Sequence, residues 1–182
     1  MKKYLVSTLI ISLTIAGLLG IGVVLSGSFH EIQLKVLLTT LAFTVYSIIG
    51  LCCHTIIHSK YAAVAKTGLV VTMVALLHAV ATTWVTPETL SFLQMRFSLF
   101  IVAISFAHCS LMLLLNSDSQ VAMIAKSVAI GAGIFTALVA IAMIYSPYTD
   151  VAMLKLLIVI LIVAVISTII APILALQTKR TT

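Results

Sequence analysis

Residues 154–177 read LKLLIVILIVAVISTIIAPILALQ, an apolar run with a single charged residue, Lys155. About 20 mostly apolar residues in a helix cross a hydrocarbon core about 30 Å thick, so this run is long enough to span a membrane. The rest of the chain has the same character, since 63% of its 182 residues are hydrophobic, 8% are charged and the mean hydropathy is +1.32. Soluble domains carry about 25% charged residues. The composition therefore predicts a protein whose surface faces lipid.

Six runs of this kind predict an all-α integral membrane protein with six transmembrane helices. The runs are apolar on every face, whereas membrane-crossing strands alternate apolar and polar residues. Because the connections between them are short, we expect one transmembrane domain over residues 1–182 and no soluble domain. The first run is longer than the apolar core of a signal peptide, so we expect it to be a retained helix. The predicted spans are residues 4–26, 35–57, 66–86, 93–115, 126–145 and 154–177.

Basic residues predict the orientation of these spans. Short loops keep Lys and Arg on the cytoplasmic side, and an N-terminus inside places seven bases at cytoplasmic ends and three outside. We therefore expect an integral protein of the cell (inner) membrane with both termini cytoplasmic. The net charge of +6 then lies mainly at the inner face, where it would meet anionic lipid headgroups. The inner bases are Lys2, Lys3, Lys60, Lys66, Lys126, Lys179 and Arg180, and the outer bases are Lys35, Arg96 and Lys155.

A period of about sixty residues indicates three copies of one helical hairpin. The helices that start at the outer face begin near a base, at spacings of 61 and 59 residues. Two outer turns pair a hydroxyl residue with proline, the pattern of an N-cap followed by N1, as Thr86-Pro87 and Ser146-Pro147. We predict hairpin repeats at 1–60, 61–120 and 121–182 around a pseudo-threefold axis along the membrane normal. The alternative is that any six-helix protein with short loops shows such a period.

Small residues spaced four apart predict close helix packing, because lipid supplies no hydrophobic drive for association and backbones must approach closely. Glu31 and Lys35 have the same spacing at the start of a helix, in the order that favours an ion pair. The small pairs are Ala16/Gly20, Ala75/Ala79, Ser127/Gly131 and Ala129/Gly133.

Two histidines are the main candidates for a site inside the bundle. No Asp, Glu, Lys or Arg lies near the centre of a predicted span, which argues against a pump of the carboxylate type. His78 lies twelve residues from Lys66, and His108 lies twelve residues from Arg96, so we expect both near mid-depth on neighbouring helices, facing inward. They could ligate a haem, bind a metal or a quinone, or relay protons. The alternative is that both imidazoles only hydrogen-bond across helices.

A second cluster lies at the inner end of the second predicted span. His54 and His58 are spaced i, i+4, so on a helix they share a face and could present two imidazoles to one metal ion. A complete site needs a third or fourth ligand, and at most one of Cys52 and Cys53 points the same way. The alternative is that the histidines lie at headgroup level and the cysteines are small packing residues.

Three classes of function follow from these observations. Common enzyme motifs are absent: there is no P-loop, G-x-G-x-x-G, H-E-x-x-H, G-x-S-x-G or C-x-x-C. The scattered bases without interleaved aromatics argue against a nucleic-acid partner. We rank first a non-enzymatic membrane subunit or scaffold that forms a homo-oligomer or joins other membrane subunits. The alternatives are a haem-, metal- or quinone-binding redox protein using His78 and His108, and a channel or carrier for a small neutral or anionic solute.

Overall fold

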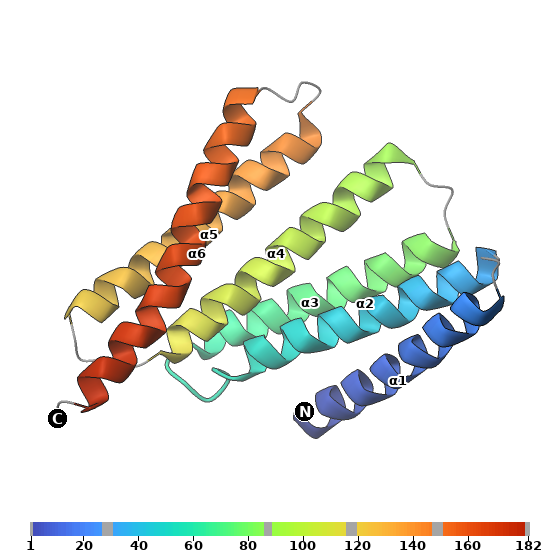
Figure 1. The fold of residues 1–182 in the computed structure, drawn as a ribbon, viewed down its shortest axis with the longest axis horizontal. Helices are drawn as coiled ribbons and strands as arrows, with labels where there is room; N and C mark the ends of the chain where they lie inside the picture. The colour runs from blue at the N-terminus through green and yellow to red at the C-terminus, as the bar shows by residue number, and fades with distance from the viewer. Residues whose placement is uncertain (1, 27–30, 86–88, 116–119, 147–150, 181–182) are drawn as a thin grey trace.

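The computed structural model describes residues 2–26, 31–85, 89–115, 120–146 and 151–180, and every regular element in these ranges is an α-helix. Figure 1 shows the helices in chain order. They are α1 (Lys2–Ser26), α2 (Glu31–His54), α3 (Ala62–Trp84), α4 (Leu90–Leu114), α5 (Gln120–Tyr145) and α6 (Val151–Arg180).

Five of the helices, α2 to α6, are long and apolar enough to cross a membrane. In α1 the apolar segment is shorter and covers Val6–Gly22. The all-helical prediction is confirmed, and the helices are compatible with a multi-pass membrane protein. Their length follows from the sequence, because long runs of residues are apolar on all faces, and the few glycines and Pro172 within the runs do not end the helices.

The helix ends differ from the predicted ends. Helix α2 begins at Glu31 instead of residue 35, because its first turn is polar and does not register as part of an apolar run. Helix α4 begins at Leu90 with Thr89 at its N-cap, three residues after the start that the Thr86-Pro87 pattern predicts; Thr86, Pro87 and Pro147 lie outside the described residues. The predicted Glu31–Lys35 ion pair is confirmed, with 2.7 Å between Oε1 and Nζ.

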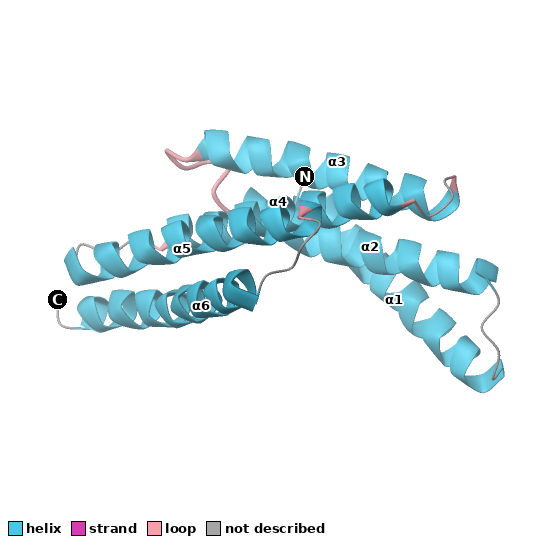
Figure 2. Ribbon diagram, turned by 90° about the horizontal axis from the view of Figure 1, so that it is seen from above, coloured by secondary structure: helices cyan, strands magenta, loops and turns pink. Residues whose placement is uncertain are grey.

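The helices form an open row in which each packs mainly on its chain neighbours. The packed pairs are α1 on α2, α2 on α3, α3 on α4, α4 on α5 and α5 on α6, with one further contact between α2 and α4. Figures 1 and 2 show the row from two directions, with α1 at one end and the α5–α6 hairpin at the other. Within the described residues, the first and third hairpins do not close into a ring.

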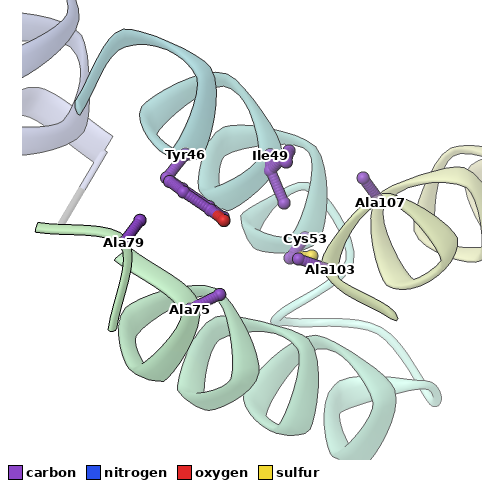
Figure 3. Close-up of a cluster of buried hydrophobic side chains, with 7 residues drawn as sticks. All are labelled: Tyr46, Ile49, Cys53, Ala75, Ala79, Ala103 and Ala107. Carbon is purple, nitrogen blue, oxygen red and sulfur yellow. The ribbon is translucent and has the colours of Figure 1, made fainter. Parts of the chain in front are cut away.

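The main core lies between α2, α3 and α4 (Figure 3), where small side chains let the backbones approach. A Cβ at Gly68 would lie 2.8 Å from Cys53 Sγ and 3.1 Å from the Cβ of Phe106, so α3 touches both neighbours there. The predicted Ala75/Ala79 pair is buried in this core. The buried residues of the cluster are Tyr46, Ile49, Cys53, Ala75, Ala79, Ala103 and Ala107.

Side-chain hydrogen bonds connect neighbouring helices near the α3–α4 and α5–α6 connections. Trp84 Nε1 on α3 donates to Thr39 Oγ1 on α2 at 2.9 Å. Gln94 Nε2 on α4 donates to the Ile144 carbonyl at 2.8 Å, and this carbonyl belongs to the last turn of α5. Because the last carbonyls of a helix have no partner within it, the Gln94 bond caps α5.

Candidate functional site

His108 faces α5 and occupies the space left by a glycine. Its Nε2 lies 3.2 Å from the Ala129 carbonyl. A Cβ at Gly133 would lie 2.8 Å from the His108 Cδ2, so the ring lies directly on the Gly133 backbone. A carbonyl can only accept a hydrogen bond, so in a neutral imidazole this contact requires the proton on Nε2 and leaves a lone pair on Nδ1. The predicted Ala129/Gly133 pair is therefore used within the chain, as the surface against which His108 packs.

His108 also lines a groove of about 410 Å³ between α4, α5 and α6, which we call the His108 groove. Most of its lining is aliphatic, and three hydroxyl residues interrupt it: Ser105, Thr136 and Thr168. Each hydroxyl donates to a carbonyl four residues earlier on its own helix, at 2.8, 2.8 and 2.6 Å respectively. With these donors already used, the side chains around the groove offer lone pairs and no free protons.

His78 does not share this site. It is half-buried on α3, it does not line the His108 groove, and its Nε2 is buried without a hydrogen-bond partner in the described structure. The Gly68–Phe106 contact aligns α3 with α4. From that level His78 is ten residues away toward one end, and His108 is two residues away toward the other. At 1.5 Å per residue the histidines differ in depth by about 18 Å.

The matching depth predicted for His78 and His108 is therefore wrong. The expected depth of His108 takes Arg96 as the level of the membrane surface and counts twelve residues from it. In the structure six helical residues, starting at Leu90, precede Arg96, so His108 lies deeper along α4 than the count implied. A haem held between these two imidazoles would need both rings at one level, and the structure does not bring them together.

The shared helix face predicted for His54 and His58 is also wrong. Helix α2 ends at His54, and residues 55–61 form turns. The turn bonds run from Ile57 N to the His54 carbonyl and from Ser59 N to the Ile56 carbonyl, at 3.2 and 3.1 Å. This tighter i to i−3 winding places about three residues in a turn, so a spacing of four no longer aligns the two rings.

The metal-binding hypothesis gains no further ligand from the structure. His54 is half-buried with an unpartnered Nδ1, and His58 is exposed. Across residues 2–26, 31–85, 89–115, 120–146 and 151–180, no group of three or more His, Cys, Asp or Glu side chains could hold a metal ion. Cys53 is buried in the main core, and Cys52 and Cys109 are half-buried; all three are free thiols.

The structure brings together a group of basic and aromatic residues that no sequence motif marks. Lys60, Tyr61 and Lys126 line a second hollow, together with the end of α4, the first turns of α5 and Ala171 of α6. Lys60 and Tyr61 are sequence neighbours, but Lys126 is more than sixty residues away, so only the packing of α5 beside the α2–α3 turn brings it there. In the sequence, only the adjacent Lys60-Tyr61 pair hints at this hollow.

Comparisons with protein-family models, with curated proteins and with solved structures found no match to this chain.

Proposed function

We propose that this chain is a six-span subunit of the cell (inner) membrane, with both termini cytoplasmic, that acts by binding other membrane helices, including further copies of itself. Five long apolar helices and the shorter apolar segment of α1 support the span count. The excess of seven bases over three supports the orientation. Six helices of similar length that pack on their chain neighbours support a repeat built from helix pairs.

The observation that carries the proposal is a set of glycines that nothing within the described chain uses. A Cβ added at any of four glycines would meet no atom within 4 Å, whereas Gly68 and Gly133 touch neighbouring helices. Glycine inside a helix destabilises it by about 0.5–1 kcal/mol relative to alanine. In membrane helices small residues allow a second helix to approach closely. The four open glycines, which we infer to meet helices outside this chain, are Gly17, Gly20, Gly22 and Gly131.

On α5 the two small pairs face different ways. Ala129 is fully buried and Gly133 carries the His108 ring, so this pair serves the contact with α4. Ser127 and Gly131 are exposed, and the Ser127 hydroxyl donates to the Met123 carbonyl of its own helix at 3.0 Å. We therefore propose that the Ser127/Gly131 face of α5 contacts a second copy of the chain.

The test is energy transfer between donor- and acceptor-labelled copies mixed in lipid vesicles at several protein-to-lipid ratios. Gly131→Ile should weaken association about ten-fold, since overpacking a close contact costs about 1–3 kcal/mol. Ala81→Leu is the matched control: Ala81 is an exposed small residue on α3, and its neighbours four residues away, Leu77 and Val85, are large. Transfer in the unmodified protein no greater than chance proximity, or equal transfer in Gly131→Ile and Ala81→Leu, would refute self-association through this face.

A second function has one specific observation in its favour, the acceptor-only lining of the His108 groove. A ligand that suits it is apolar and carries a hydroxyl, such as a quinol, because its O–H can donate to the Nδ1 of His108 or to a hydroxyl oxygen. Haem ligation by His78 with His108, a metal at His54 and His58, and a solute path along a central axis find no comparable support in the described residues. Extraction of the purified protein with organic solvent should release such a ligand, and His108→Phe should reduce the amount recovered. An empty extract, or unchanged recovery from the variant, would exclude this function.

A further inference from the structure

A hollow of about 690 Å³ lies where the α2–α3 turn meets the end of α4 and the first turns of α5. Two ammonium groups lie near one aromatic ring at this hollow. The Nζ of Lys60 is 5.1 Å from the centre of the Tyr61 ring, and the Nζ of Lys126 is 5.9 Å from the same centre. A tyrosine face attracts cations at such distances. One ring thus holds two positive charges beside a single opening, which we call the basic hollow.

Local hydrogen bonds position these side chains. The Ser59 hydroxyl donates to the Ile56 carbonyl at 2.8 Å and accepts the Tyr61 N–H at 3.1 Å, which shapes the turn that presents Lys60 and Tyr61. The Lys126 ammonium donates to the Leu115 carbonyl at the end of α4, at 2.9 Å. An ammonium group has three N–H donors, so Lys126 keeps further donors for a ligand.

Neither lysine meets a carboxylate within the described residues. Glu31 is the one acid among them, and it pairs with Lys35 at the other end of α2. Asp118 lies outside the described residues. Two like charges held near one ring repel each other, and an anion between them would turn repulsion into attraction. The basic hollow therefore favours a negatively charged ligand.

The basic hollow continues into an apolar groove of about 440 Å³ between α4 and α5. Leu113 and Ile130 line both spaces, so the groove begins where the hollow ends. Beyond them the groove follows apolar side chains such as Phe106, Ile134 and Leu138 along the two helices. A ligand that fills both spaces has an anionic head and a hydrocarbon chain.

We propose that the basic hollow and this groove bind one anionic phospholipid, with its phosphate between Lys60 and Lys126 and an acyl chain along α4 and α5. Basic pockets between membrane helices on the cytoplasmic side bind anionic headgroups in this way, and the bases of this end are those assigned to the inner face. The proposal does not rest on self-association or on the His108 groove: the hollow shares Ser127 with the Ser127/Gly131 face, but neither Gly131 nor His108 lines the hollow or its groove.

The test is a titration of the full-length protein, in neutral detergent, with phosphatidylglycerol or phosphatidylcholine of identical acyl chains, followed by native mass spectrometry. Lys60→Gln and Lys126→Gln should each weaken phosphatidylglycerol binding about five-fold, and the double variant about twenty-five-fold, from about 1 kcal/mol per lysine. Phosphatidylcholine binding should not change. Lys66→Gln is the matched control, because Lys66 is an exposed base in the first turns of α3, close in sequence to Lys60, and it does not line the hollow.

Three further arms separate the proposal from its rivals. Ile134→Trp fills the groove without changing a charge, and it should weaken phosphatidylglycerol binding about ten-fold. Inorganic phosphate, added in excess over phosphatidylglycerol, should not displace the bound lipid. Displacement by phosphate alone would show that the site binds a free anion. Asp118→Asn should leave the affinity within about two-fold, because a large increase would show that Asp118 already occupies the lysines. That increase, or an equal loss in Lys66→Gln, would overturn the proposal.

Discussion

Replacing Gly133 with alanine should displace His108 and break its bond to α5. The added Cβ would lie 2.8 Å from the His108 Cδ2 and 3.1 Å from its Nε2, well inside the usual separation of about 3.5–4.0 Å between non-bonded carbon atoms. The ring must therefore move away by several tenths of an ångström. Its Nε2 is already 3.2 Å from the Ala129 carbonyl, at the long end of the range for an N–H···O bond. A further shift removes that hydrogen bond.

The size of the effect follows from a comparison with Gly131, two residues away on the same helix. A Cβ at Gly131 meets no atom within 4 Å, so Gly131→Ala should show only the helix-propensity gain of about 0.5–1 kcal/mol. Gly133→Ala has the same gain but loses a cross-helix hydrogen bond, worth about 0.6 kcal/mol on average and at most about 1.7 in membrane proteins. We expect Gly133→Ala to be less stable than Gly131→Ala by about 0.6–1.7 kcal/mol.

The assay is equilibrium unfolding with dodecyl sulfate in mixed micelles, at protein concentrations where the chain is monomeric. A double-mutant cycle isolates the contact: in a His108→Ala background, Gly133→Ala should regain the full propensity benefit and match Gly131→Ala. If Gly133→Ala and Gly131→Ala have the same unfolding free energy with His108 present, the His108 ring does not lie on Gly133. The position of that ring in the groove would then be wrong.

Trp84→Phe should lower the unfolding free energy by about 0.6 kcal/mol through loss of the bond to Thr39, and adding Thr39→Val should cost nothing further; independent, additive losses would contradict the bond. Gln94→Leu should cost about as much or slightly more, because it uncaps the Ile144 carbonyl at the end of α5, and amide exchange should rise in the last turn of α5 alone. An unchanged exchange pattern would argue against the cap. A reporter enzyme fused after Thr182 should read cytoplasmic in cells, and an external reading would mean an odd number of spans.

The helices can be predicted from the sequence because each is recognised by its own apolar composition over about twenty residues. That composition does not depend on which helices it packs against. The helix ends are predicted less well, since nothing in the chain near His54 marks a stop: residues 51–61 contain neither glycine nor proline. The end of α2 there depends on the turn that connects it to α3. That early end is what separates His54 from the face on which His58 was expected.

The site is harder to predict because it depends on how each helix is rotated about its axis. Amphipathic helices reveal that rotation through an apolar stripe, whereas α4 is apolar all round, so its sequence does not say whether His108 faces α3 or α5. The structure turns it to α5, away from His78. The meeting of Lys126 with Lys60 and Tyr61 is likewise a product of tertiary packing, invisible to any local pattern.

The row order of the helices also bears on how the protein is made. Among the described residues, the closely packed pairs join helices that are adjacent in the chain, apart from α2 with α4, which skips a single helix. Contacts that are close in sequence form quickly, and synthesis delivers the N-terminal elements first. Helix α1 therefore waits only for α2 to be made. Each later helix, when it leaves the ribosome, finds a packing partner that has already been synthesised.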